Sequence, residues 1–196
     1  MAQLYELFSD GPLWFFTMEL IEGVSFLEAI RGEEDLAGRI RRLRETLPPL
    51  VEALEVMHRS GRLHRDLKPS NVMVSQSGRV VVLDFGLAAE LDAEGIHEAS
   101  HSRLVGTPAY MAPEQSSARS LTAAADWYSV GVMIYQALTD RLPFEGRLLE
   151  ILQRKETTPA QPPCELNPAI PEPLNQLCVS LLQHDPESRG DGLRTQ

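Results

Sequence analysis

Three short segments of this sequence carry side chains that could do chemistry together: residues 64–71, 84–86 and 112–114. The first holds a carboxylate, an ammonium and an amide, and the second holds another carboxylate. Carboxylate and amide oxygens are ligands that Mg²⁺ prefers. Taken alone, an Asp-x-Lys sequence is most often a surface ion pair, and an Asp-Phe-Gly sequence is most often a turn. The occurrence of all three segments in this order favours one shared site.

The three segments resemble motifs of the eukaryotic-type protein kinase superfamily. His-Arg-Asp-Leu-Lys-Pro-Ser-Asn at 64–71 is similar to its catalytic loop, Asp-Phe-Gly at 84–86 to its metal-binding motif, and Ala-Pro-Glu at 112–114 to the end of its activation segment. The resemblance covers nearly the whole chain and implies an α+β, mainly α, protein-kinase-like fold. It predicts a partial kinase domain over residues 1–196. Residues 1–20 would be a remnant small-lobe hairpin and hinge, and residues 21–196 the large lobe with an incomplete final helix.

Phosphoryl transfer depends on positioning and charge neutralisation more than on covalent chemistry. The resemblance implies that Asp66 aligns the substrate hydroxyl and accepts its proton, while Lys68 neutralises charge on the transferred group. Asn71 and Asp84 would be oxygen ligands to Mg²⁺, with ATP as the phosphoryl donor. Gly86 would give the backbone the freedom that turns the Asp84 carboxylate into the site.

The same resemblance places a nucleotide-binding hinge at residues 18–21. Met18 would be the gatekeeper, and the backbone groups of Glu19 and Ile21 would meet the adenine edge. Met73 would lie under the adenine ring, although a buried methionine is more often a plain core residue.

The residues around Lys68 and the run Gly-Thr-Pro-Ala-Tyr-Met at 106–111 resemble the serine/threonine branch of the family, and the style of residues 106–115 resembles its bacterial members. The expected partner is therefore a protein substrate with serine or threonine hydroxyls. Thr107 is expected to form a hydrogen bond near Asp66 and Lys68.

In this family, an arginine at the position of Arg65 marks kinases that are switched by phosphorylation of the activation loop, because arginine pairs well with phosphate. Ser100 and Ser102 are the candidate acceptors, and for each the alternative of an ordinary loop serine is equally open.

Other motif residues are expected to have structural roles. Asp126 would hold the backbone of the catalytic loop, and Arg189 would pair with Glu114. Loss of one partner of such a buried pair costs about 3–5 kcal/mol. His64 and Phe85 are interpreted as packing residues and not as acid–base groups or ligands.

Hydrophobic spacing and turn residues predict the elements that position these side chains. Ser25 and Glu28 match a capping box, with a polar loop as the alternative. A helix is expected to start near Pro48 and Pro49 and to follow a turn at 41–44, because proline suits a first helical turn and kinks an interior. The other predictions are hairpins of 4–8 with 13–20 and of 72–74 with 80–83, helices at 123–139, 148–154 and 174–182, a loop at 87–106, and an irregular segment at 158–173.

The amino-acid composition excludes some classes of binding partner. The formal net charge of −10 argues against binding to nucleic acid or to an anionic membrane. No apolar run approaches the length of a membrane span. Cys164 and Cys178 are interpreted as reduced thiols, with one disulfide as the alternative, and a cytoplasmic location follows. Only Lys68 and Lys155 are lysines among the 18 basic residues.

Two features of the family are missing from the sequence. No Gly-x-Gly occurs ahead of Gly61, and no lysine occurs ahead of Lys68, so neither a glycine-rich loop nor a small-lobe lysine is present. The isolated chain is therefore expected to bind ATP weakly, to transfer little phosphate and to aggregate through the strand edge near residues 14–16. The alternative function is a non-catalytic kinase-like interaction module. The presence of all four site residues, Asp66, Lys68, Asn71 and Asp84, favours the kinase.

Overall fold

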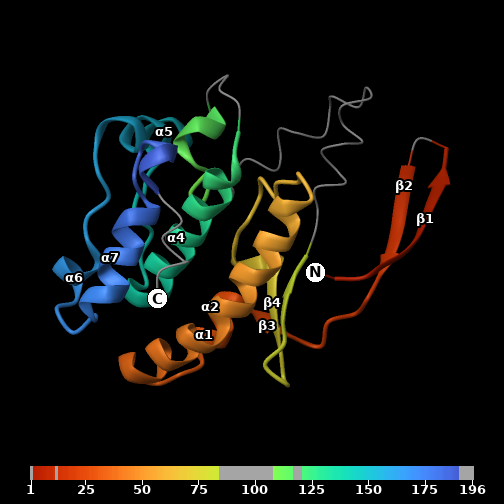
Figure 1. Cartoon of the computed structure of the whole chain (residues 1–196), viewed down its shortest axis with the longest axis horizontal. Coiled ribbons are helices and arrows are strands. Elements are labelled where there is room, and N and C mark those ends of the chain that lie inside the picture. The colour runs from red at the N-terminus through yellow and green to blue at the C-terminus, as the bar shows by residue number, and fades with distance from the viewer. Residues whose placement is uncertain (1, 12, 84–107, 117–120, 190–196) are drawn as a thin grey trace.

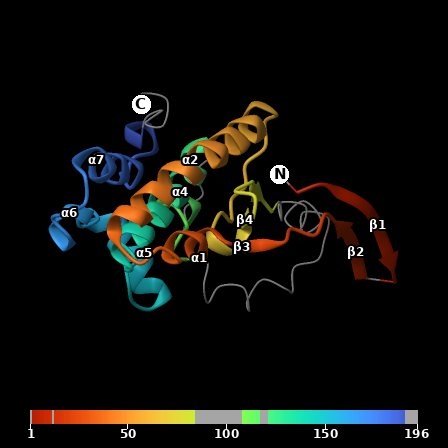
Figure 2. The ribbon, with the colours of Figure 1, turned by 90° about the horizontal axis from the view of Figure 1, so that it is seen from below.

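The computed structural model describes residues 2–11, 13–83, 108–116 and 121–189. A helical body packs against a small sheet, and a two-stranded hairpin projects from the side of that sheet (Figures 1 and 2). None of the described helices is long and apolar enough to cross a membrane.

The hairpin consists of β1 (Leu4–Asp10) and β2 (Leu13–Met18), which pair antiparallel as the turn residues predict. Gly11 adopts a φ of +58° in the connection, a backbone region that glycine enters without strain. Successive residues of a strand point to opposite faces, and the neighbouring residues Leu7 and Phe8 are 56% and 46% exposed. The described part of the hairpin thus presents apolar side chains on both faces.

The second sheet has the order β3-β4-β5, with β3 (Gly23–Ser25), β4 (Val72–Ser75) and β5 (Val80–Val82) all antiparallel. The predicted hairpin of β4 and β5 is confirmed. The sequence did not predict β3, a strand of three residues that lies against β4. A Cβ at Gly23 would lie 2.3 Å from the Val74 carbonyl oxygen, so this close pairing needs glycine.

The predicted capping box is confirmed at the start of α1 (Phe26–Arg31). The Glu28 carboxylate accepts a hydrogen bond from the Ser25 backbone N–H at 2.9 Å, and the Ser25 hydroxyl accepts one from the Glu28 N–H at 3.5 Å.

The predicted start of the next helix is wrong. Helix α2 runs from Leu36 to Arg59, so Pro48, Pro49 and the arginine cluster at 41–44 all lie inside it. An interior proline costs a helix about 3 kcal/mol. The apolar face nevertheless continues without a break through the prolines, and each buried leucine contributes about 1.5–3 kcal/mol. Helix α2 buries this face: Leu43, Leu47, Leu50, Leu54 and Met57.

Helix α4 forms the centre of the helical body and has the predicted bounds, Ala123–Thr139. A Cβ at Gly131 would lie 2.8 Å from the Leu181 Cβ, so glycine permits the close approach of α7. Helix α2 packs on α4 as well (Figures 1 and 2). The remaining helices are α5 (Leu148–Thr157), α6 (Pro163–Leu166) and α7 (Glu172–Leu181), with 3-10 turns η1 (Pro69–Asn71), η3 (Pro113–Ser116) and η4 (Pro186–Arg189).

Three predictions for this region need correction. Helix α5 continues three residues beyond 154, helix α7 starts at Glu172 and not at residue 174, and the segment expected to be irregular contains the short helix α6. In α6 and α7, proline occupies the first turn. Its missing N–H costs nothing there, because the N–H groups of a first turn have no acceptor within the helix. Cys164 and Cys178 are free thiols as predicted, and burial raises the pKa of Cys178.

Candidate active site

The catalytic-loop motif places two polar side chains, those of Lys68 and Asn71, around the Asp66 carboxylate. Lys68 Nζ donates a hydrogen bond to Asp66 Oδ2 at 2.8 Å. Asn71 Nδ2 donates to the Asp66 carbonyl oxygen at 2.8 Å and lies 3.4 Å from Asp66 Oδ2. The turn η1 explains this closure, because the Asn71 N–H donates to the Lys68 carbonyl at 2.9 Å and folds the chain back over Asp66.

Two buried side-chain atoms of the catalytic loop lack a hydrogen-bond partner among the described residues, His64 Nδ1 and an oxygen of Asp66. The Asp66 side chain is 40% exposed, yet its Oδ1 is buried and has no hydrogen-bond partner among the described residues. An unsatisfied buried acceptor costs free energy unless a ligand or substrate supplies a donor. This oxygen therefore has unused capacity to accept a hydrogen bond.

A buried carboxylate on α4 anchors the backbone just before Asp66. Asp126 Oδ1 accepts from the Arg65 N–H at 2.8 Å, and Asp126 Oδ2 accepts from the His64 N–H at 2.9 Å. His58 Nε2 lies 2.8 Å from the same Oδ2, and its ring packs edge-on against Trp127. The anchor holds Arg65 at a φ of +65°, in the left-handed region that costs a non-glycine residue about 1–2 kcal/mol.

The carbonyl group of Arg65 is held by a second contact, from the side chain of Gln115. Gln115 Nε2 donates to the Arg65 carbonyl oxygen at 2.7 Å, and Gln115 Oε1 accepts from the Ala112 N–H at 2.8 Å. One side-chain amide thus joins the catalytic loop to the segment that precedes Glu114.

Glu114 and Arg189 form a buried, bidentate ion pair, with N–O distances of 2.5 and 2.8 Å. The remaining guanidinium donors bond to the carbonyl oxygens of Ala124, Gln183 and His184, so all five N–H groups of Arg189 have acceptors. This complete satisfaction offsets the desolvation of the pair and ties η3 to η4 and to the start of α4.

The predicted packing residue His64 is buried, and its Nε2 lies 3.0 Å from the Leu83 carbonyl oxygen at the end of β5. Arg65 has an exposed side chain.

The predicted nucleotide residues lie at the end of β2, on the connection from β2 to β3, and on β4. The Glu19 N–H donates to the Gln3 carbonyl at 2.8 Å, and the Glu19 carboxylate forms an ion pair with Arg79. This ion pair lowers the pKa of Glu19. Met18 ends β2, Ile21 is half-buried, and Met73 is half-buried in the central strand of the second sheet.

Six predicted site residues and the loop expected at 87–106 lie outside the described residues, and their roles stay predictions. These residues are Asp84, Phe85, Gly86, Ser100, Ser102 and Thr107.

The described residues contain no cluster of three or more His, Cys, Asp or Glu side chains that could hold a metal ion. The donor set at the site nevertheless suits Mg²⁺ in its chemistry. Because Asn71 turns its Nδ2 toward Asp66, its amide oxygen, at the other end of the planar carboxamide group, is left as a hard oxygen donor.

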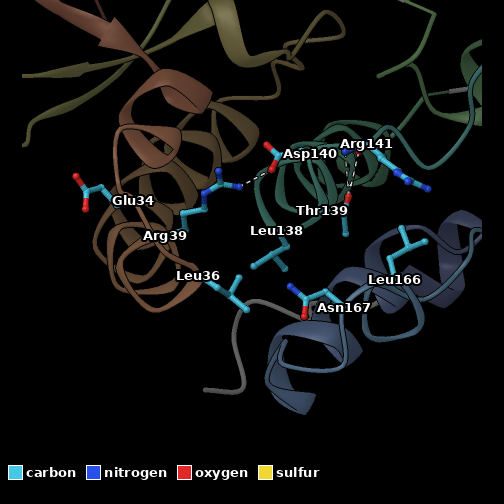
Figure 3. A pocket seen from close by; sticks show the side chains of 9 residues that line it. All are labelled: Glu34, Leu36, Arg39, Leu138, Thr139, Asp140, Arg141, Leu166 and Asn167. Atoms are coloured by element: carbon cyan, nitrogen blue, oxygen red, sulfur yellow. Dashed lines mark hydrogen bonds and ion pairs between the residues drawn. The ribbon is translucent and has the colours of Figure 1, made fainter.

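Two hollows are lined by described residues other than Asp66. One of about 320 Å³ lies between α2, the end of α4 and α6, and Arg39 points across it toward Asp140 (Figure 3). Its polar lining is occupied by surface ion pairs, since Asp140 binds both Arg31 and Arg39 at 2.9 and 2.6 Å.

The contacts of Asp126 with the catalytic loop and of Glu114 with Arg189 are those that the resemblance to protein kinases implied. The fold and this loop geometry together place the chain in the class of protein-kinase-like folds. Comparison with known proteins gives the same class, because the family model for the protein kinase domain matches residues 1–191. The chain belongs to the protein kinase domain family.

The curated relatives compared with the chain are all named serine/threonine-protein kinases. The chain is 35% identical over 195 residues to serine/threonine-protein kinase Pkn1 of Myxococcus xanthus, covering 96% of this chain and 27% of that protein. It is 31% identical to the probable serine/threonine-protein kinase PknB of Bifidobacterium longum, over 89% of this chain and 25% of that protein. It is 30% identical to serine/threonine-protein kinase PknB of Mycobacterium tuberculosis, over 91% of this chain and 28% of that protein. The chain thus spans about a quarter of the length of these relatives.

Sequence reasoning missed three residues that organise the site: His58, Gln115 and Lys155. Gln115 directly follows the Ala-Pro-Glu motif, which was its available signal. The signal for Lys155 was the scarcity of lysine. His58 had no signal beyond its place near the end of a helix.

Proposed function

We propose that this protein is a serine/threonine protein kinase that transfers the terminal phosphoryl group of ATP to hydroxyl groups of protein substrates. The observation that carries the proposal is the buried, unpartnered Oδ1 of Asp66 beside the Lys68 ammonium. The printed names of the relatives, which are serine/threonine-protein kinases, support the substrate class.

In this proposal, Asp66 aligns the substrate hydroxyl and takes its proton as the new oxygen–phosphorus bond forms and ADP leaves. Lys68 neutralises negative charge that develops on the transferred group. Asn71 and Asp84 would hold Mg²⁺ through their oxygens. When bound, ATP supplies the phosphoryl group and Mg²⁺ neutralises the charge of its phosphates.

The adenine edge would lie against the backbone of Glu19 and Ile21, with Met18 and Met73 as apolar neighbours. The bonds that Glu19 makes with Gln3 and Arg79 support this role, because they fix the backbone on which adenine recognition would depend.

The test is phosphoryl transfer from Mg-ATP to a serine/threonine peptide library by the 196-residue chain. Because the sequence lacks a glycine-rich loop and a lysine ahead of Lys68, we expect turnover well below the roughly 1–100 s⁻¹ of kinases. Asp66→Asn should lower the rate by at least about 100-fold, because general-base alignment contributes about 10²–10⁴.

Asp140→Asn is the matched control, since it makes the same chemical change at an exposed position. Equal rates in wild type and Asp66→Asn, or no transfer together with no thermal stabilisation by millimolar Mg-ATP, would overturn the proposal and favour the non-catalytic interaction module.

A further inference from the structure

Lys155 on α5 is a buried cation whose hydrogen bonds all go to the backbone. Its side chain is 3% exposed, and its ammonium donates to the carbonyl oxygens of Pro108, Ala109 and Met111 at 2.7, 2.9 and 2.6 Å. The ammonium also lies 5.2 Å from the centre of the Tyr128 ring, which adds a cation–π contact. Lys155 thus makes four contacts that stabilise the fold, and it is one of only two lysines in the chain.

The contacts hold an otherwise irregular segment, residues 108–111. The fourth carbonyl, that of Tyr110, accepts from the Ser129 hydroxyl on α4 at 2.8 Å. All four carbonyl oxygens of the segment therefore have side-chain donors from α4 or α5. Without these donors, buried acceptors in the segment would lose their partners, and the backbone would have to rearrange.

This segment connects directly to the catalytic loop. The next residue, Ala112, donates its N–H to Gln115, which in turn donates to the carbonyl of Arg65, the residue before Asp66. The position of residues 108–111 relative to Asp66 is thus set by Lys155 at one end and by Gln115 at the other.

The ionisable groups at and around the Tyr128 ring, which Lys155 contacts, come from three elements. Helix α4 contributes Tyr128, turn η3 contributes Glu114, and turn η4 contributes Arg189, whose guanidinium lies 4.9 Å from the centre of the same Tyr128 ring. The neighbours of Lys155 on α5, Arg154 and Glu156, are exposed. Burial lowers the pKa of Lys155 to about 7, while the three carbonyl oxygens and the ring favour the charged form.

We propose that Lys155 is a positioning residue whose ammonium holds residues 108–111 in the conformation that presents the protein substrate to Asp66. The part that concerns the substrate rests on the kinase function proposed above. A neutral amine has only two N–H donors and cannot serve three carbonyl oxygens, so loss of the charge loosens the segment.

The first test is hydrogen exchange of the backbone amides of residues 109–112 in the 196-residue chain. Lys155→Met keeps most of the side-chain volume and removes the charge, and we expect exchange at these amides to rise by at least about tenfold, because charge-assisted bonds are lost. Lys155→Arg should restore at least part of the protection. Arg154→Met, which removes an exposed cation from the same helix, is the matched control and should leave exchange unchanged. Unchanged exchange in Lys155→Met would overturn the proposal.

A second test follows the titration of the wild-type chain and uses a variant only to assign one signal. Lysine labelled with ¹³C at Cε gives two side-chain signals, and the one that disappears in Lys155→Arg belongs to Lys155. We expect the amide signals of residues 109–112 to shift with the same midpoint as the Lys155 signal as the pH is raised. Amides that do not follow the Lys155 titration would refute the proposal.

The part that concerns the substrate is tested by steady-state kinetics. Lys155→Met should raise the KM for a peptide about tenfold and leave kcat and the KM for ATP within about twofold, because the lost contacts shape the substrate segment and not the transferring groups. An unchanged peptide KM would overturn this part. Absence of phosphoryl transfer in the wild type, together with no thermal stabilisation by Mg-ATP, would refute only the proposed kinase function, since the exchange and titration measurements need no catalysis.

Discussion

Asp126→Asn is the substitution whose effect follows most directly from the contacts of the site. In the wild type, one buried carboxylate accepts from the N–H groups of His64 and Arg65 and lies within hydrogen-bond distance of His58 Nε2. Asparagine has nearly the same shape, but one of its two terminal atoms is an NH₂ group that donates and does not accept. The substitution therefore tests the acceptors and leaves the packing unchanged.

The lower-energy orientation of the new amide keeps the oxygen toward His58 and His64 and turns the NH₂ group against the Arg65 N–H. One bond to a charged acceptor, which contributes about 1.5–3 kcal/mol, is then lost, and the other two become neutral bonds of about 0.5–1.5 kcal/mol each. We expect the free energy of unfolding to fall by about 3–5 kcal/mol. A domain of this size loses about 2–4 °C in Tm per kcal/mol, so the Tm should fall by about 6–20 °C.

The substitution should also displace Asp66. Arg65 holds a φ of +65° because its N–H and its carbonyl are both bonded, and release of the N–H removes one of the two restraints. The measurements are urea denaturation for stability and phosphoryl transfer for the site, with Asp140→Asn as the control for both. Asp140 is 52% exposed, and its ion pairs contribute about 0–1 kcal/mol (Figure 3). Asparagine also tolerates the left-handed conformation of residue 140.

A difference of less than about 1 kcal/mol between Asp126→Asn and Asp140→Asn would refute this reasoning, because burial and the three donors are what distinguish the two carboxylates.

Three further predictions follow from contacts between distant residues. Gln115→Met should lower the free energy of unfolding by about 2 kcal/mol, since two hydrogen bonds of about 1 kcal/mol are lost, whereas Gln153→Met on the exposed face of α5 should change it by less than about 0.5 kcal/mol in the same urea titration. Arg189→Met deprives the buried Glu114 carboxylate of its guanidinium and should cost about 3–5 kcal/mol by the same measurement. Because burial lowers the pKa of Lys155 to about 7 from 10.5, the native chain binds fewer protons than the unfolded chain between these pH values, and the free energy of unfolding should rise with pH there. Lys155→Met should lack this rise, and parallel pH profiles of the two proteins would contradict the burial of the ammonium.

Contiguous patterns predicted the elements that depend on local geometry. The capping box at Ser25, the hairpin of β4 and β5 and the bounds of α4 follow from interactions within a few residues, and all three are confirmed. The start of α2 was predicted wrongly, because a local rule about proline was given more weight than the long apolar face that α4 and the second sheet bury.

The residues of the candidate site also divide into those that local sequence predicted and those that it did not. The types and spacing of Asp66, Lys68 and Asn71 within one loop were enough to predict that these side chains lie close together, since the turn η1 brings them together locally. Gln115 and Lys155 were not assigned, because their partners lie 44 to 50 residues away along the chain.

By itself, the sequence of this protein determined the family, the catalytic loop and most of the helices and strands, because each of these is encoded in neighbouring residues. The tertiary structure alone decided that the prolines of α2 lie inside a helix, that β3 joins the second sheet, and that a buried lysine holds residues 108–111. Each of these outcomes depends on a balance between a local cost and burial or hydrogen bonding supplied by distant segments, and that balance exists only once the chain has folded.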